Sequence, residues 1–179
     1  MRLLPLLLLL CSSVIYGQNE SKNKFWPSKM EVLSPTQSKL NNSISLYATK
    51  QELLKQLGKP TKVEKAELEC ALSPEQEKAK VRNLYYYGKT MFLIYDERAE
   101  LMNVSFRSGK FIYKTPKITL TGKTTFKEIE KVYPRATKTA LQENKGAMIR
   151  ILPCKECDGQ VLLYMEEGKL VQLELWQPC

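Results

Sequence analysis

The amino-acid sequence predicts an α+β fold of two tandem units, each a short helical segment packed on one face of a four-stranded antiparallel sheet. An internal repeat and a strand pattern support this prediction. The segment Ile44–Leu46 recurs 74 positions later as Ile118–Leu120, and a helix start follows each copy. Runs that alternate apolar and polar residues come next in both halves, as expected for sheets with one covered face. Self-similarity at a fixed spacing indicates a repeated supersecondary unit.

Each predicted unit begins with a short helix that carries its own N-terminal cap. Thr49–Glu52 and Thr125–Glu128 both have the spacing T-x-x-E of a capping box. In this motif the threonine oxygen accepts one backbone hydrogen bond and the glutamate accepts another from the capping residue. Gly58 ends the first helix and Pro134 ends the second. Helices this short are marginal alone, so each is expected to lie on a sheet.

Strands are predicted to follow each helix. The first unit has strands at residues 63–70, 81–87, 90–95 and 101–106, with an extra helical segment at 72–80; the second has them at 137–142, 147–152, 160–165 and 170–176. The last strands of the two units match best, because Leu101–Phe106 and Leu170–Leu175 place polar residues at the same alternate positions. Both are therefore expected to have one covered and one open face.

The open face of these sheets is the candidate binding surface. If Met102 and Val104 face the helix, alternation sends Leu84, Tyr86, Phe92 and Ile94 inward with them. The residues then left on the open face include four aromatic ones, Tyr85, Tyr87, Tyr95 and Trp176. Aromatic side chains supply contact area at little entropic cost, so they favour protein binding. The alternative is that they form strands and are covered by other parts of the chain.

The N-terminal region predicts export. Residues 1–17 combine a positive start, a leucine run and a small residue at Gly17, as in a secretory signal peptide. The leucine run is too short to span a membrane. Cys11 offers an alternative, lipid attachment, although the preceding Leu10 is larger than such sites prefer. Residues 18–43 are predicted to form a polar arm, residues 44–110 the first unit and residues 111–179 the second.

The four remaining cysteines predict two disulfides in an exported protein. A turn at Glu167–Gly168 would pair Gln160 with Trp176, which brings Cys157 near Cys179 and leaves Cys70 with Cys154. A Cys154–Cys157 bridge with Cys70–Cys179 is the main alternative. An all-thiolate metal site is less favoured because only one C-x-x-C is present. A redox pair is less favoured because this C-x-x-C is not followed by a predicted helix, the setting that lowers the pKa of the attacking thiol.

Composition excludes several activities. The 179 residues include no histidine, which removes every catalytic arrangement and metal site that uses one. The basic residues behind the net charge of +9 are interspersed with acidic ones, so a continuous basic surface that binds nucleic acid is not expected. An anionic envelope surface is retained as a partner. Thr121–Thr125 lacks the first glycine of a phosphate-binding loop. The chain is therefore predicted to be neither an enzyme nor a cofactor protein.

The segment Thr49–Pro60 carries a family resemblance. Its helix ending in Leu-Gly-Lys-Pro resembles that of small bacterial envelope proteins of the barrel-assembly lipoprotein type, and two such units in tandem are similar to the layout of the β-lactamase inhibitory proteins. The resemblance covers residues 44–179 as a pattern, and it implies an exported bacterial protein that holds another protein on its sheet.

These observations predict an exported, non-catalytic protein-binding module in the secreted or periplasmic compartment. The alternatives are a structural envelope component anchored by lipid on Cys11, and a thiol or metal protein that uses Cys154 and Cys157.

Overall fold

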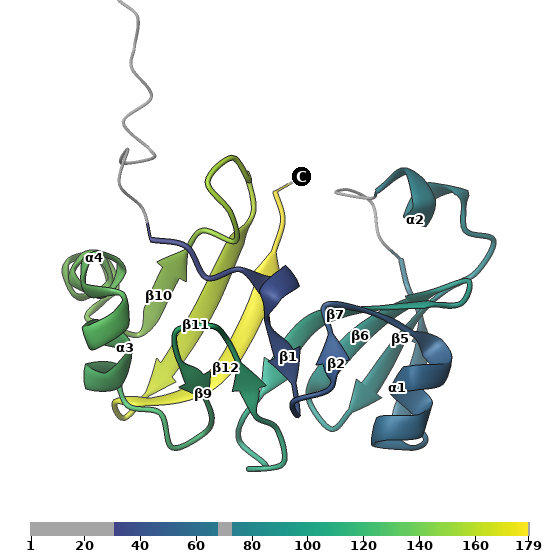
Figure 1. Ribbon diagram of the computed structural model, residues 1–179, viewed down its shortest axis with the longest axis horizontal. Coiled ribbons are helices and arrows are strands. Elements are labelled where there is room, and N and C mark those ends of the chain that lie inside the picture. Colours follow the sequence, from purple (N-terminus) through teal and green to yellow (C-terminus); the bar gives the residue numbers. More distant parts are fainter. Residues whose placement is uncertain (1–30, 68–72, 179) are drawn as a thin grey trace, which may run out of the picture.

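The computed structural model describes residues 31–67 and 73–178. This part of the chain has an α+β fold with four α-helices and two antiparallel sheets. In Figure 1, α1 lies beside one end of the large sheet, and α3 and α4 lie beside the other. The helices are α1 (Lys50–Leu57), α2 (Pro74–Lys78), α3 (Phe126–Val132) and α4 (Pro134–Asn144), and a 3₁₀ turn covers Pro35–Gln37.

The large sheet runs through both predicted units without a break. Its strand order is β10-β11-β12-β7-β6-β5-β4, with β3 also paired to β7. The strands are β3 (Tyr47–Thr49), β4 (Lys62–Lys65), β5 (Arg82–Tyr87), β6 (Thr90–Tyr95), β7 (Arg98–Ser105), β10 (Met148–Ile151), β11 (Gln160–Glu166) and β12 (Lys169–Trp176). Because Leu173 of β12 pairs with Val104 of β7, strands from both halves of the sequence share one sheet. The equivalence of two tandem units stays a prediction.

A second, small sheet contains the repeated β segments. Its order is β2-β1-β8-β9, so the strands that hold Ile44 and Leu120 lie at its two edges. The strands are β1 (Lys39–Leu40), β2 (Ile44–Ser45), β8 (Tyr113–Lys114) and β9 (Thr119–Leu120).

Both predicted capping boxes form. The Thr49 hydroxyl oxygen accepts from the Glu52 amide at 3.1 Å, and the Glu52 carboxylate accepts from the Thr49 amide at 2.8 Å. Thr125 and Glu128 make the same pair of bonds at the start of α3. Gly58 caps α1 with a φ of 75°, a left-handed conformation that glycine adopts without strain. Local sequence therefore determines where these helices begin and where α1 ends.

The strand predicted at residues 137–142 is wrong, because this segment lies in α4. Pro134 does end α3, but it also occupies the first turn of α4, where a missing backbone N–H costs nothing. Thr137 and Ala140 are the buried residues of α4, and their spacing is that of one helix face. A run of six residues fits both the helical period of 3.6 and the strand period of 2, so its sequence pattern could not distinguish a helix from a strand.

One core lies between the large sheet and the elements that cover it. It joins sheet residues such as Phe92, Val104 and Leu163 to Leu53 of α1 and Ile129 of α3. Residues 31–43, predicted as part of a polar arm, also belong here, because Leu33 and Leu40 are fully buried in this core. The prediction failed there because the few apolar residues of this segment follow no helical or strand period among Ser, Asn, Lys and Pro.

Several sequence predictions fall outside the described residues. They concern the signal peptide at residues 1–17 and the side chains of Cys11, Phe25, Trp26, Cys70 and Cys179. Among the helices that the structure describes, none is long and apolar enough to cross a membrane.

Candidate binding groove

A groove opens on the large sheet where β12 separates from β7. Along one edge of β7, β3 pairs with residues 98–100, whereas β12 pairs with residues 103–105. Beyond Glu174, β12 makes no further pair with β7. The resulting groove has a volume of about 750 Å³. Its apolar and aromatic lining includes Leu46 and Tyr47 near β3, Leu101 and Met102 of β7, and Leu175 and Trp176 of β12, and polar residues complete it.

Two large side chains at the groove are available to solvent. The exposed fraction is 55% for Tyr47 and 39% for Trp176. They come from different strands, β3 and β12, and both line the same groove. The predicted pairing of Gln160 with Trp176 is confirmed, and it fixes the face on which this tryptophan lies.

The other predicted binding residues are distributed differently. Tyr95 lies on the same sheet face but is buried, and it packs with Leu93, Ala66 and Ala79. Tyr87 is buried in the main core on the opposite face, and Tyr85 packs against that core. The prediction that Tyr85 and Tyr87 belong to the open face is therefore wrong.

Strand register explains this error. A two-residue turn pairs Tyr87 with Thr90, and consequently Tyr85 with Phe92. Directly opposed residues share a face, so the inward Phe92 brings Tyr85 and Tyr87 to the core and sends Leu84 and Tyr86 away from it.

A β-bulge displaces Met102 as well. The pairing of β6 with β7 shifts between Met91, which faces Asn103, and Phe92, which faces Leu101. Met102 is the extra residue, and it packs with the Leu93 and Tyr95 cluster instead of the core. Regular alternation places Met102 on the same face as Val104, and this is why it was predicted inward. The bulge breaks the alternation between the two residues, so Met102 lies on the opposite face.

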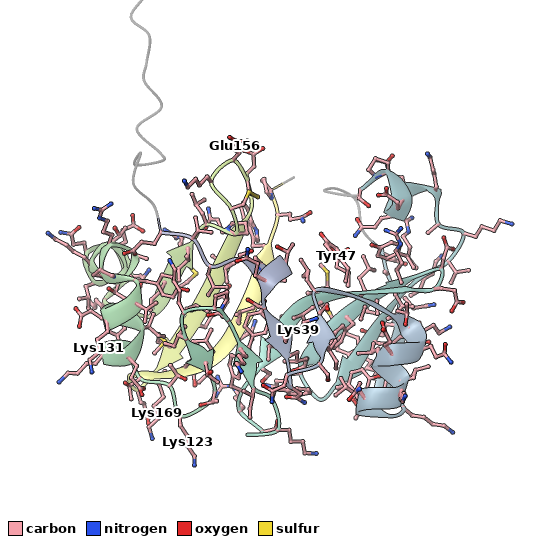
Figure 2. All side chains as sticks on the ribbon, viewed as in Figure 1. Lys39, Tyr47, Lys123, Lys131, Glu156 and Lys169 are labelled. Atoms are coloured by element: carbon pink, nitrogen blue, oxygen red, sulfur yellow. A yellow bond between two sulfur atoms is a disulfide. The ribbon has the colours of Figure 1, made fainter. Side chains whose placement is uncertain are left out.

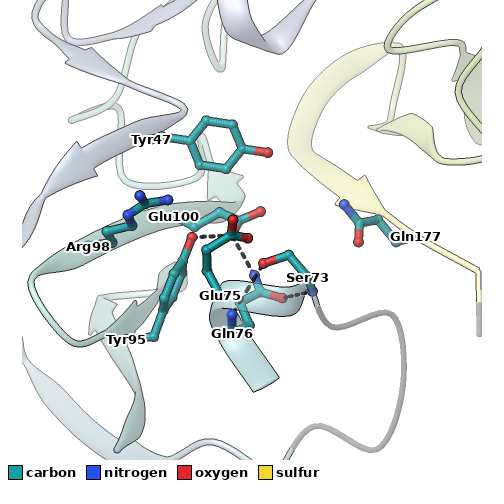
Figure 3. Close-up of a pocket in the computed structure, with 8 residues that line it drawn as sticks. All are labelled: Tyr47, Ser73, Glu75, Gln76, Tyr95, Arg98, Glu100 and Gln177. Carbon is teal, nitrogen blue, oxygen red and sulfur yellow. Dashed lines mark hydrogen bonds between the residues drawn. The ribbon is translucent and has the colours of Figure 1, made fainter. Parts of the chain in front are cut away.

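A smaller pocket of about 170 Å³ adjoins the groove around the carboxylate of Glu100. Glu100 is only 7% exposed. The Gln76 Nε2 amide donates to its Oε2 atom at 2.6 Å, and the Tyr95 hydroxyl donates to the same atom at 3.4 Å. Figure 3 shows both bonds, with the Tyr47 ring on one side of the carboxylate and Gln177 across the pocket. Burial raises the pKa of Glu100 above its ordinary value, although the two hydrogen bonds oppose this effect.

The cap of α2 holds Gln76 in place. The Gln76 amide nitrogen donates to the Ser73 hydroxyl at 3.3 Å, and the Gln76 Oε1 atom accepts from the Ser73 amide at 2.8 Å. The side-chain carbonyl is thus used by the helix cap, which leaves the Nε2 group to face Glu100. One glutamine both starts α2 and positions the buried carboxylate.

Charges around the groove differ from those of the whole chain. The two cavities are lined by four carboxylates, those of Glu75, Glu100, Asp158 and Glu174, and by one described cation, Arg98. The Tyr164 hydroxyl donates to Glu174 at 3.0 Å. Burial, followed by this hydrogen bond, raises the pKa of Tyr164 to about 12. The described lining of the two cavities is therefore acidic within a basic protein. In Figure 2, Lys123, Lys131 and Lys169 lie away from Tyr47, whereas Lys39 lies nearer to it.

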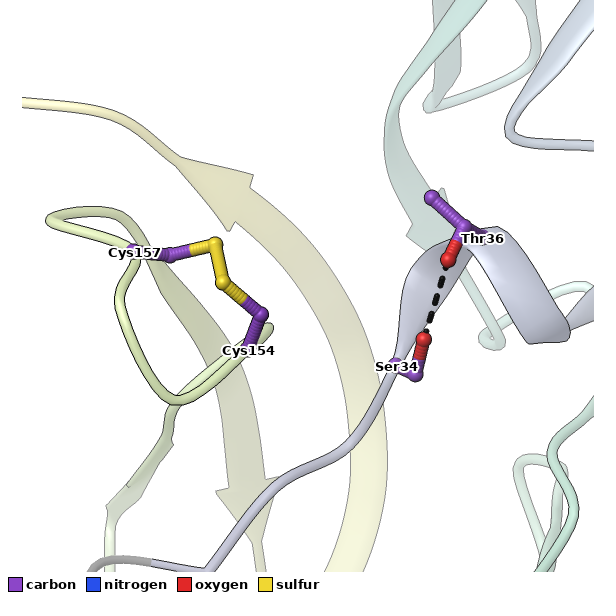
Figure 4. The surroundings of a disulfide bond; sticks show 4 residues. All are labelled: Ser34, Thr36, Cys154 and Cys157. Carbon is purple, nitrogen blue, oxygen red and sulfur yellow. Dashed lines mark hydrogen bonds between the residues drawn. A yellow bond between two sulfur atoms is a disulfide. The ribbon is translucent and has the colours of Figure 1, made fainter.

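A disulfide loop forms another side of the groove. Cys154 is bonded to Cys157, with a Cα–Cα distance of 5.3 Å (Figure 4). The favoured pairings Cys157–Cys179 and Cys70–Cys154 are therefore wrong, because each needs one of these two sulfurs. A Cβ added at Gly159 would lie 2.8 Å from the Trp176 carbonyl oxygen. The loop therefore lies so close to the end of β12 that position 159 has no room for a side chain.

Sequence reasoning missed Tyr47, Gln76 and Glu100. Tyr47 lies just before the predicted capping box at Thr49, and Gln76 lies in the segment predicted only as an extra helix, so neither was considered as a site residue. The spacing S-x-x-Q of Ser73 and Gln76 was the signal that could have indicated the cap of α2. Across residues 31–67 and 73–178, no three His, Cys, Asp or Glu side chains form a group that could hold a metal ion.

Comparisons with family models, curated proteins and solved structures find no match for this chain.

Proposed function

We propose that this chain is an exported, non-catalytic protein-binding module, and that the groove between β3 and β12 holds a segment of its protein partner. One observation carries the proposal. Tyr47 and Trp176 are exposed beside an apolar groove of about 750 Å³ on a sheet face that the helices α1, α3 and α4 do not cover. Binding sites are typically concave and apolar with a few polar groups, and aromatic residues dominate their energetics.

The polar groups of the groove support binding over catalysis. Glu100 accepts from Gln76 and Tyr95, and Glu174 accepts from Tyr164. Both carboxylates are thus held by neutral donors, an arrangement that orients a bound group without a nucleophile and base in contact.

The compartment is part of the same proposal. The disulfide between Cys154 and Cys157 favours an oxidising environment, such as the periplasm or the exterior. The predicted signal peptide points to the same compartment, and the layout similar to the β-lactamase inhibitory proteins makes a protein the expected ligand.

Photo-crosslinking in the native compartment tests the groove. A photoreactive amino acid at Gln177, which lines the groove, should give one discrete crosslinked partner. Trp176→Ala and Tyr47→Ala should each reduce that crosslink at least about tenfold, because hot-spot aromatics contribute 2 kcal/mol or more.

Leu141→Ala and Val63→Ala are matched controls, since both side chains are exposed and neither lines the groove. They should leave the crosslink unchanged. Equal yields in all four variants would show that the groove is not the binding surface.

A further inference from the structure

The pocket around Glu100 has the composition of a cation site. It is lined by the rings of Tyr47 and Tyr95, the carboxylates of Glu75 and Glu100, and the polar side chain of Gln177. Tyr47, Glu100 and Gln177 also line the larger groove, so the pocket continues it. Aromatic faces and carboxylates together attract ammonium and guanidinium groups.

Glu100 is a buried carboxylate without a cationic partner among the described residues. Its Oε2 atom has two donors, but no described group donates to Oε1. The one cation of the described lining, Arg98, makes no ion pair with it. Buried charges are normally paired, because a carboxylate loses much of its hydration on burial. A carboxylate that is 93% buried, hydrogen-bonded on one oxygen and bordering a groove is therefore poised for an external cation.

We propose that this pocket takes the side chain of a lysine or arginine from the partner segment whose apolar residues occupy the groove. This inference rests on the proposed function and adds the chemistry of the partner. The cation would reach Glu100 between the rings of Tyr47 and Tyr95, while an adjacent apolar residue contacts Trp176. Because the chain has a net charge of +9, basic segments are repelled elsewhere, and the acidic pocket provides selectivity.

The groups around Glu100 set the pH at which the pocket carries charge. The pKa values of Tyr47 and Tyr95 are raised, chiefly by burial, so both phenols stay neutral. Hydrogen bonds from its own backbone amide and from Ser73 lower the pKa of Glu75, so it stays ionised. Arg98 is the other charged residue of the lining. Glu100 is consequently the group that loses its charge first on acidification, and cation binding should weaken as pH falls through its raised pKa.

Two blocked pentapeptides test the pocket by NMR titration of the full exported chain. The first is Ac-Ala-Leu-Lys-Tyr-Ala-NH₂, and the second replaces lysine with norleucine, which keeps the four side-chain carbons and lacks the ammonium group. At pH 7.5 the lysine peptide should bind at least tenfold more tightly and shift the amides of Tyr47, Glu100 and Gln177. Glu100→Gln should abolish this preference while leaving the affinity for the norleucine peptide unchanged.

Glu130→Gln is the matched control, because it removes one negative charge from an exposed helix position. It should retain the lysine preference. Equal binding of both peptides to the natural chain, a preference that survives Glu100→Gln, or no shift of these amides would overturn the proposal. So would a shift of the same amides in the free chain on Trp26→Ala or Lys24→Ala, because the chain's own N-terminal region would then be the occupant.

Partner crosslinking separates this inference from the proposed function. If Trp176→Ala abolishes the crosslink and Glu100→Gln leaves it unchanged, the groove is the binding surface and the proposal of a cation pocket is wrong. If the lysine preference depends on Glu100 but Trp176→Ala leaves the crosslink unchanged, the pocket binds cations and the proposal that the groove holds the partner is wrong.

Discussion

The two faces of the large sheet use the same kinds of side chain for different purposes. On the face covered by helices, Tyr87 and Phe92 pack edge to face with ring centroids 6.0 Å apart, and Phe92 is fully buried. On the other face, Tyr47 and Trp176 remain exposed beside a groove. Aromatic residues thus stabilise the fold on one side and offer contact area on the other. Which role a residue has depends on strand register, not on residue type.

The faces also differ in their polar groups. Each face buries one polar oxygen without a hydrogen-bond partner among the described residues: the Tyr113 hydroxyl in the main core, and the Asn103 Oδ1 atom on the groove face. The groove face additionally buries the carboxylate of Glu100. Burying such groups costs free energy unless they are paired. The buried carboxylate of Glu100, held by the neutral donors Gln76 and Tyr95, therefore distinguishes the groove face from the covered one.

The largest expected difference between the faces is in core packing. Phe92→Ala should lower the free energy of unfolding by about 3–5 kcal/mol, because it leaves a cavity in a fully buried site. Trp176→Ala should cost about 1 kcal/mol or less, since this side chain is partly in solvent. Urea unfolding followed by far-UV circular dichroism measures both. Similar losses in the two variants would mean that the faces are not distinguished as described.

A single hydroxyl gives a finer test of where the tyrosines lie. The Tyr87 hydroxyl donates to the Gly58 carbonyl at 3.0 Å and so ties β5 to the end of α1. Tyr87→Phe should cost about 1 kcal/mol of unfolding free energy, the usual net value of one such bond. Tyr85→Phe is the matched control on the same strand and face, and it should change stability very little. If the two substitutions have equal effects in urea unfolding, the placement of Tyr87 at the core is wrong.

Local features of this fold were predictable from sequence, because the residues that form them are close along the chain. The caps at Thr49 and Thr125 satisfy amides only three residues away, and the Glu167–Gly168 turn pairs Glu166 with Lys169. Such features depend on nearest neighbours and tight turns, which propensity rules describe well. The pairing of Gln160 with Trp176 needs in addition the register shift between Tyr164 and Met165.

Features that depend on distant parts of the chain were missed. The bulge at Met102 arises between β6 and β7, and it changes face assignments without any glycine or proline to mark it. The Glu100 site needs α2, β6 and β7 together, because Gln76 and Tyr95 reach it only in the folded chain. The Cys154–Cys157 bond was an open alternative, since connectivity does not follow from spacing.

The smallest expected effect compares a buried carboxylate of the groove face with an exposed one. Since burial raises the pKa of Glu100, the folded chain holds this proton more tightly than the unfolded chain does. The unfolding free energy of the natural chain should therefore fall as pH rises from the pKa of Glu100 in the unfolded chain through its pKa in the folded chain. Glu100→Gln should remove this loss. The unfolding free energy of Glu100→Gln minus that of the natural chain should then increase across this range.

Glu52 should behave in the opposite way. The backbone amide and hydroxyl of Thr49 lower the pKa of Glu52, so its ionised form stabilises the folded chain above the unfolded pKa, and this stabilisation is lost as pH falls through the folded one. The unfolding free energy of the Glu52→Gln variant minus that of the natural chain should consequently decrease with rising pH. Urea unfolding of both variants at several pH values between about 3 and 7 measures the two slopes, a range that brackets ordinary carboxyl pKa values. Slopes of the same sign would contradict the contrast, because a buried carboxylate without a cation and an exposed capping carboxylate must respond oppositely to protonation.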